Sequence, residues 1–206
     1  MQDASTLVIF GAGGHGRVVA DAALALGRWP RIVATDRDPA RCAGELLPGV
    51  PLLPVEQAMA ILGAVFHIGI GHAESRQREA APVGGRLATV VHPAAVVSPF
   101  ATVEAGSFVA AQAVVAPGAR VGACAIVNHG AVVDHDAVVG AFSHVAPNAA
   151  LGGHSEVGEF VLVGAGAAVL PSVRVAPRVV LGAGAVVRRP ITEAGVYAGV
   201  PAGRVR

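Results

Sequence analysis

From Val91 to Val187 an aliphatic residue recurs at every sixth position, and all 17 of these positions hold Val or Leu. This period differs from that of an α-helix, which repeats about every 3.6 residues, and from that of a strand, which alternates at every second residue. A coil of three short strands accounts for it, because each aliphatic residue then points inward and stacks on the one 18 positions later. We therefore expect a parallel β-helix of about five to six coils over residues 86–190.

The positions around each aliphatic residue are also restricted. The residue two places before it is small in 14 of the 17 repeats, and Gly often follows it, as at Gly122, Gly140 and Gly164. We interpret the small residue as one that permits a tight corner. We interpret the glycine as one that tolerates unusual corner backbone angles or the close approach of a neighbouring coil.

The segment before the repeats, residues 1–85, follows a different pattern. A short apolar run at residues 7–10 leads into GAGGHG at residues 11–16, and residues 17–24 are suited to a helix. Further strands are expected at residues 32–35 and 65–70. A strand, a glycine loop and a helix form the unit in which helix N–H groups face a phosphate. We therefore expect a half-Rossmann-like α/β domain over residues 1–85.

The glycine segment also fits G-x-G-x-x-G, with Asp36 about 20 residues further on, which is the pattern of NAD binding. The domain leaves room for only half of a dinucleotide fold, and no second mononucleotide half follows it. A mononucleotide that carries a sugar fits this space better, and NAD is kept as an alternative.

Composition narrows the class of protein. Hydrophobic residues make up 53% of the chain and aromatics only 4%, so the core must consist of regular layers of small aliphatic residues. The formal charge is +1 without a basic block, which argues against a nucleic-acid partner. No apolar window is long enough for a membrane span, and no signal peptide is recognisable, so we expect a cytoplasmic protein without membrane insertion.

Metal and redox chemistry are not indicated. Cys42 and Cys124 form no paired motif and are expected to be free thiols. Cys124 does not complete a metal set with His129 and His135, because six residues turn the chain by about one face of the coil. We therefore predict no metal site.

The hexapeptide repeat resembles that of the left-handed β-helix acyltransferases. The order of glycine loop, short α/β domain and hexapeptide repeats resembles the NeuD/PglD group of bacterial sugar acyltransferases over nearly the whole chain. This resemblance implies a left-handed coil, a homotrimer, acetyl-CoA as co-substrate and a nucleotide-linked amino sugar as acceptor. It assigns the nucleotide sugar to the glycine loop and to the ends of the next strands. The implied residues are Gly13, Gly14, His15, Asp36, Arg37, Gly71 and His72, extending to Glu74.

Acyl transfer requires a base, and histidine has a pKa suited to that role. His135 stands out because it lies between Asp134 and Asp136, near a corner, where a carboxylate can fix the ring tautomer. The NeuD/PglD-like enzymes that this chain resembles have an acid-His-acid segment at the corresponding position. The resemblance therefore implies that His135 is the base and that Asp136 is its supporting acid. The family residue is Glu, and Asp is one methylene shorter.

The resemblance also implies the acetyl-CoA site. It assigns a contact to His144, a thioester-binding backbone N–H to Gly153, and backbone contacts with the pantetheine arm to Ala165 and Ala183. The tail at residues 191–206 resembles the ending of many such enzymes and is expected to fold back over the last coils. His129 and His154 are expected in turns or at a subunit contact, and Asn128 is a candidate for positioning substrate.

The leading hypothesis is an acetyl-CoA-dependent N-acetyltransferase that acts directly on the amino group of a UDP- or GDP-linked deoxy amino sugar. The alternatives are a sugar O-acetyltransferase of the sialic-acid type and a non-catalytic trimer that binds a nucleotide sugar.

Overall fold

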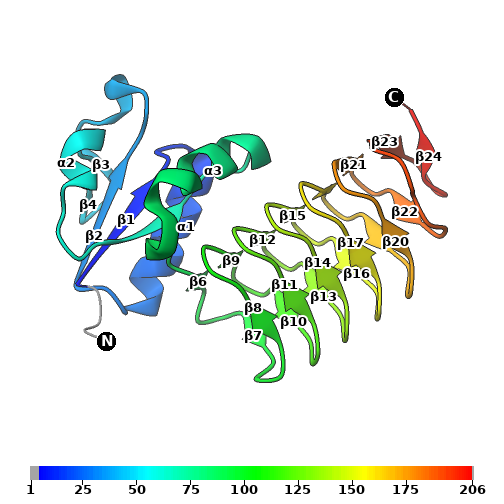
Figure 1. Cartoon of the computed structure of the whole chain (residues 1–206). Coiled ribbons are helices and arrows are strands. Elements are labelled where there is room, and N and C mark those ends of the chain that lie inside the picture. Colours follow the sequence, from blue (N-terminus) through cyan, green and yellow to red (C-terminus); the bar gives the residue numbers. More distant parts are fainter. Residues whose placement is uncertain (1–4, 206) are drawn as a thin grey trace. The chain divides into compact units, whose positions relative to one another are not determined.

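The computed structural model describes residues 5–205, which form two compact units that divide between Pro93 and Ala94 (Figure 1). The N-terminal unit is an α/β domain, and the C-terminal unit is a parallel β-helix. None of the described helices combines the length and the apolar character needed to cross a membrane.

The N-terminal unit is built on a three-stranded parallel sheet with the order β2 (Arg31–Thr35), β1 (Thr6–Phe10), β5 (Val65–Ile68). The central strand β1 is buried along its whole length, which explains its unbroken apolar run. Helix α1 (Gly14–Leu26) follows β1 through the glycine loop and ends at Gly27, which has a φ of 64°. The other elements are β3 (Glu45–Leu47), β4 (Val50–Pro51), α2 (Val55–Met59), α3 (Ala73–Ala80) and two 3₁₀ helices (Pro39–Arg41 and Ala81–Arg86).

The expected elements of this unit are confirmed. The strands at residues 7–10 and 32–35 correspond to β1 and β2, and the strand expected at residues 65–70 ends at Ile68. The helix begins at Gly14 rather than at residue 17, so the glycine segment itself supplies its first turn.

Three sheets form the faces of the C-terminal coil. The six-stranded sheet contains β7 (Val96–Val97), β10 (Val114–Val115), β13 (Val132–Val133), β16 (Ala150–Leu151), β19 (Ala168–Val169) and β22 (Val186–Val187). The five-stranded sheet contains β8 (Thr102–Val103), β11 (Arg120–Val121), β14 (Val138–Val139), β17 (Glu156–Val157) and β20 (Arg174–Val175). The eight-stranded sheet contains β6 (Val90–Val91), β9 (Phe108–Val109), β12 (Ile126–Val127), β15 (His144–Val145), β18 (Leu162–Val163), β21 (Val179–Leu181), β23 (Gly195–Ala198) and β24 (Gly203–Arg204).

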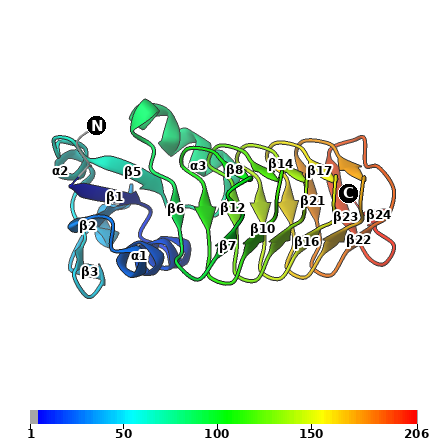
Figure 2. The same ribbon diagram turned by 90° about the horizontal axis from the view of Figure 1, so that it is seen from below.

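The coils stack in a constant parallel register. Val115 pairs with Val133, and Val133 pairs with Leu151 on the next coil. Figure 2 shows the short strands stacked along the coil. The six-residue period therefore predicted the parallel β-helix correctly, whereas its left-handed sense stays a prediction of the resemblance.

The interior of the coil contains two kinds of residue. The aliphatic positions are buried from Val109 onward, and so are the small residues two places earlier, such as Ala113 and Ala131. Both positions face inward because side chains alternate along a strand. The small residues therefore belong to the core, and the expectation that they only permit a corner was incomplete.

A left-handed backbone conformation marks each corner. It recurs at every sixth residue from Gly106 to Gly184, with φ between 53° and 75°, and most of these residues are not glycine. A side chain in this region strains the backbone. Hydrogen bonds between coils offset this strain, as when the N–H of Asp136 donates to Pro117 O at 3.1 Å and that of His154 to His135 O at 3.0 Å.

The glycines that follow the aliphatic residues have a different role. Gly122 does not have a positive φ, but a Cβ at this position would lie 2.8 Å from the backbone N of Ala141 on the next coil. A Cβ at Gly140 would collide with the backbone of Gly158 in the same way. Close approach of the next coil, rather than corner angles, therefore selects glycine here.

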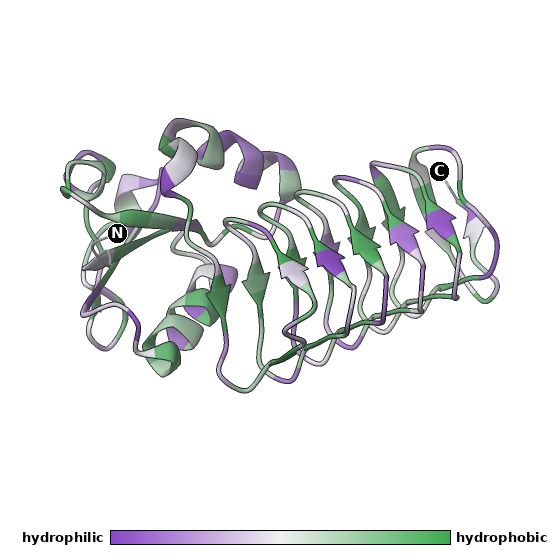
Figure 3. Ribbon diagram, turned by 60° about the horizontal axis from the view of Figure 1, so that its bottom comes forward, coloured by the Kyte–Doolittle hydropathy of each residue, from purple (hydrophilic) through white to green (hydrophobic). Residues whose placement is uncertain are grey.

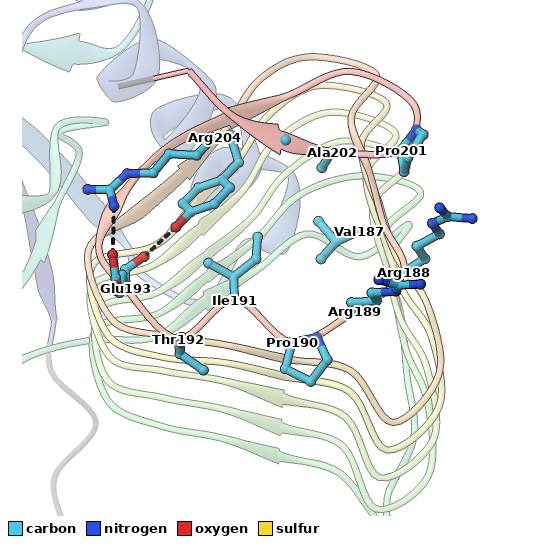
Figure 4. Close-up of a pocket in the computed structure, with 12 residues that line it drawn as sticks. Val187, Arg188, Arg189, Pro190, Ile191, Thr192, Glu193, Pro201, Ala202 and Arg204 are labelled. Carbon is cyan, nitrogen blue, oxygen red and sulfur yellow. Dashed lines mark hydrogen bonds and ion pairs between the residues drawn. The ribbon is translucent and has the colours of Figure 1, made fainter.

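The tail continues the eight-stranded sheet. Strand β23 pairs in parallel with β21, and β24 turns back to pair antiparallel with β23. The Arg204 Nη1–Glu193 Oε2 ion pair at 2.6 Å joins the two ends of this turn, and Figure 4 shows it beside a cavity of about 350 Å³ at the end of the coil. Arg188 and Arg189 also line this cavity.

We predict that the N-terminal unit loses stability as the pH falls. His67 on β5 is buried, and burial lowers its pKa to about 4, with the nearby Arg76 guanidinium acting in the same direction and a hydrogen bond to Ala88 O opposing it. The unfolded chain binds a proton near pH 6.5, so stability is complete above that pH and falls by about 3 kcal/mol towards pH 4. Urea unfolding followed by the fluorescence of Trp29, the single tryptophan, measures this loss.

The variant His67→Asn keeps a donor near the position of Nδ1 for Ala88 O and cannot titrate, so its loss of stability over this pH range should be smaller by most of that amount. The exposed His72→Asn serves as the matched control. An equal pH dependence in wild type and His67→Asn would contradict the assignment.

Candidate active site

The acid-His-acid segment lies at a corner of the coil between β13 and β14. We call the corners that lead from the six-stranded to the five-stranded sheet the His135 edge, and it includes residues 135–136 and 153–154. The strands that flank these two corners pair with one another, so the corners lie directly above one another on successive coils. Side chains that are distant in the sequence therefore meet at this edge.

His135 and Asp136 form a bonded pair. The Nδ1–H of His135 donates to Asp136 Oδ2 at 2.9 Å, and the backbone N–H of His135 donates to Asp134 Oδ1 at 2.7 Å. The hydrogen bond with Asp136 raises the pKa of the His135 imidazole, and the same bond lowers the pKa of the Asp136 carboxyl. Both side chains are about half exposed, which leaves the Nε2 of His135 available to accept a proton. The shorter Asp side chain therefore reaches the ring.

A second imidazole approaches the same carboxylate. His154 Nε2 lies 3.6 Å from Asp136 Oδ2, and its ring meets that of His135 edge to face at 5.1 Å. Sequence reasoning missed this contact, although the signal was present, because His154 occupies the position equivalent to Asp136 on the next coil of the repeat.

Gly153 lies directly beneath the His135 ring. A Cβ at this position would lie 2.6 Å from His135 Cε1 and would also collide with Nε2. Only glycine leaves room for the imidazole in this orientation, which is a second reason for glycine besides the backbone role implied by the resemblance.

His135, Asp136 and His154 also form the one set in residues 5–205 that could hold a metal ion. Their ligand atoms lie within 4.8 Å of one another, and all three residues are exposed. In the structure Nδ1 of His135 is hydrogen-bonded to Asp136 Oδ2.

The other residues assigned to acetyl-CoA lie elsewhere on the coil. His144 is on β15 of the eight-stranded sheet, where its Nε2 accepts a hydrogen bond from Asn128 Nδ2 at 3.1 Å. Ala165 and Ala183 lie at corners that lead from the eight-stranded to the six-stranded sheet, which we call the Ala165 edge. The width of the six-stranded sheet, roughly 15–20 Å at about 3.3 Å per residue, separates this edge from His135. A single chain therefore does not bring the two groups together.

The N-terminal unit contains a separate cavity of about 330 Å³. Of the residues assigned to the nucleotide sugar, its lining includes Gly13, Gly14, His15, Asp36, Arg37 and Gly71. His72 is not part of the lining, and its exposed ring contacts Glu74 and Ser75 instead. The lining residues that sequence reasoning missed include Arg41, Ser75, Arg78 and Glu79. They come from a 3₁₀ helix and from α3, which carry no recognisable motif.

Buried polar contacts hold this cavity in shape. Asp36 Oδ2 accepts the backbone N–H of Ala12 at 2.8 Å and so ties the end of β2 to the glycine loop. Arg37 donates through Nε and Nη2 to Oε2 of the buried Glu79, at 3.0 and 2.9 Å. The buried Arg76 donates through Nη1 to the carbonyls that follow β5, those of Ile70 and Gly71, at 2.8 Å each.

The cavity is suited to an anion. No side chain caps the N-terminus of α1 at Gly13, so the N–H groups of its first turn and the positive end of the helix dipole face the lining. Its lining also contains three arginines, Arg37, Arg41 and Arg78, against two acids, Asp36 and Glu79, which leaves a small net positive charge. A diphosphate group matches this arrangement.

The chain is similar to several known proteins. Residues 6–81 match the family model described as the PglD N-terminal domain. The acetyltransferase domain of PglB from Neisseria gonorrhoeae is 35% identical, with a TM-score of 0.90 and coverage of 98% of this chain and 100% of that one. It has also been solved in complex with acetyl coenzyme A.

A mutant of GDP-perosamine N-acetyl transferase from Caulobacter crescentus, solved with CoA and GDP-perosamine, is also 35% identical. Its TM-score is 0.89, and the match covers 98% of this chain and 97% of that one. WeeI from Acinetobacter baumannii shares the fold at 19% identity, with a TM-score of 0.86 and coverage of 97% of this chain and 99% of that one. No match was found among curated proteins.

We predict that Asp136→Asn lowers the pKa of His135 from its raised value towards the ordinary 6.5, because the amide removes the charged acceptor of the Nδ1–H. Titration of the imidazole signals by NMR measures this shift. Asp134→Asn is the matched control and should produce a smaller decrease, since Asp134 bonds the backbone of His135 rather than its ring. An unchanged His135 titration in Asp136→Asn would refute the pairing.

Proposed function

Because the chain belongs to the NeuD/PglD-like family of nucleotide-sugar acetyltransferases, we propose that it transfers the acetyl group of acetyl-CoA to the amino group of a UDP- or GDP-linked deoxy amino sugar. The observation that carries this proposal is the His135–Asp136 pair above Gly153, in a chain whose other unit has an anion-binding cavity. The Caulobacter crescentus relative, named for N-acetylation of GDP-perosamine, supports an amino group as the acceptor.

The chemistry is direct transfer. The amine nitrogen attacks the thioester carbon, and Nε2 of His135 removes the proton that the nitrogen loses as the C–N bond forms. Asp136 keeps the Nδ1–H in place and stabilises the resulting imidazolium. The N–H of Gly153 is assigned to the carbonyl oxygen, which becomes negative in the tetrahedral intermediate. The C–S bond then breaks, and the CoA thiolate takes the proton from His135.

The acetyl-CoA site is proposed to lie between two copies of the chain in a homotrimer. His144, Ala165 and Ala183 are too far from His135 to share one thioester within a chain, so the Ala165 edge of one copy must face the His135 edge of the next. The outward side chains support such packing. Those of the six-stranded sheet are apolar throughout, at Val96, Val114, Val132, Ala150, Ala168 and Val186.

The five-stranded sheet has a different outer surface. It carries Arg120, Glu156 and Arg174, and Arg174 pairs with Glu156 at 3.3 Å. In Figure 3 some strands of the coil are purple, which marks hydrophilic residues, and others are green, which marks hydrophobic residues. Charged residues favour solvent, and an apolar face favours burial against another copy.

The alternatives receive less support. An NAD site would require a second mononucleotide-binding half, whereas the sheet of the N-terminal unit has only three strands among the described residues. Sugar O-acetylation uses the same base and differs only in the acceptor atom. A non-catalytic trimer would not require the exposed His135–Asp136 pair above Gly153.

We predict that the wild type releases thiol from acetyl-CoA with one member of a panel of UDP-, GDP- and dTDP-linked 4-amino-4,6-dideoxy sugars. His135→Ala should lower kcat by about 100- to 10,000-fold, the usual contribution of a general base. Glu159→Ala is the control and should retain activity, because Glu159 is an exposed corner residue between β17 and β18, away from the His135 and Ala165 edges. A product that resists hydroxylamine is an amide, because hydroxylamine cleaves an ester. Activity that persists in EDTA supports a reaction without a metal.

If no sugar in the panel increases thiol release from acetyl-CoA, the N-acetyltransferase proposal is wrong. Release that survives His135→Ala would mean that another group is the base.

We predict that Gly153→Ala lowers kcat by about 100-fold or more, because the new methyl group displaces the His135 ring from the reacting atoms. The melting temperature should change little, since the ring is half exposed and can swing outward. Gly85→Ala, where a Cβ meets open space, is the control. Full activity in Gly153→Ala would show that the observed ring position is not the catalytic one.

A further inference from the structure

A second, smaller cavity of about 150 Å³ adjoins the glycine-loop cavity and shares Asp36 and Arg37 with it. Its remaining lining residues are Pro39, Cys42, Pro54, Val55 and Glu56. The proline rings and Val55 offer apolar walls, and the charged side chains are the polar groups. A flat ring with a polar edge matches these walls.

The polar groups of this cavity differ in whether they already form hydrogen bonds or ion pairs within the protein. Both oxygens of Asp36 accept backbone N–H groups, and Arg37 uses Nε and Nη2 to bind Glu79. Glu56, in the first turn of α2, is exposed, and its carboxylate has no hydrogen-bond or ion-pair partner among residues 5–205. The Glu56 charge nevertheless acts on the Arg37 guanidinium, so the two groups lie near each other.

The order of the two cavities matches the order of groups in a nucleoside diphosphate. The diphosphate fits the N-terminus of α1 in the larger cavity. The ribose then lies near Asp36 and Arg37, which the two cavities share, and the base reaches the smaller cavity. The groups that remain available to the base are the Glu56 carboxylate and Nη1 of Arg37.

We infer that Glu56 recognises the base of the nucleotide sugar and that this base is guanine. The inference rests on the proposed function. A carboxylate accepts two parallel N–H bonds, and guanine alone among the common bases has two adjacent donors, N1–H and N2–H, on its pairing edge. Its O6, beside N1, is an acceptor for Nη1 of Arg37.

The other bases match this cavity less well. Uracil and thymine have one N–H between two carbonyl oxygens, which a carboxylate repels. Adenine and cytosine have an acceptor nitrogen beside their amino group. Glu56 therefore selects against these bases as well as for guanine.

Calorimetric titration of the full-length protein with GDP, IDP and UDP tests the inference. The wild type should bind GDP about 10-fold or more tightly than UDP, the usual discrimination of one bidentate contact. IDP, which lacks the 2-amino group, should bind more weakly than GDP. In Glu56→Gln the GDP affinity should fall by about 10-fold, and the difference between GDP and IDP should shrink. The UDP affinity should rise, because the neutral amide no longer repels the carbonyl oxygens of uracil.

Glu45→Gln, an exposed position on β3 outside both cavities, is the matched control and should leave all three affinities unchanged. UDP binding at least as tight as GDP binding, or a GDP preference that survives Glu56→Gln, would overturn the base assignment and leave the proposed function intact. Binding of neither nucleotide would overturn both.

Discussion

The fold of the C-terminal unit depends on one constraint, which is that the successive coils before the tail all have the same length. The hydrogen-bonded register repeats at the same interval along each sheet up to β22, as between Val115 and Val133 or between Val121 and Val139. Only the tail breaks it, where Leu181 pairs with Tyr197. A coil that was longer or shorter by one residue would turn its inward side chains outward. The regular core of Val, Leu, Ala and Ser follows from this constraint, and so does the left-handed residue at each corner.

The same constraint builds the candidate active site. Equivalent corner positions lie above one another, so His154 approaches the carboxylate of Asp136 and Gly153 lies beneath the ring of His135. The chemical groups are thereby fixed by the backbone of two successive coils rather than by a mobile loop. A base that must keep one tautomer and one orientation benefits from this rigidity.

The two units contribute different functions to the proposed reaction. The α/β unit offers an anion-binding cavity whose shape depends on buried charged contacts, such as that of Glu79 with Arg37. The coil offers the base and an apolar face for another copy. The separation of His135 from Ala165 and Ala183 is the physical reason for proposing that the acetyl-CoA site requires two chains.

The sequence by itself determined the parallel β-helix, because a strict period of six leaves no other regular structure. It also determined the α/β unit and the His135–Asp136 pair, whose members are adjacent in the chain. Only the tertiary structure decided which distant residues meet. The contacts of His154 with Asp136 and of Arg37 with Glu79, and the cavity beside Glu56, arise when separate segments pack together, and no local pattern records that packing.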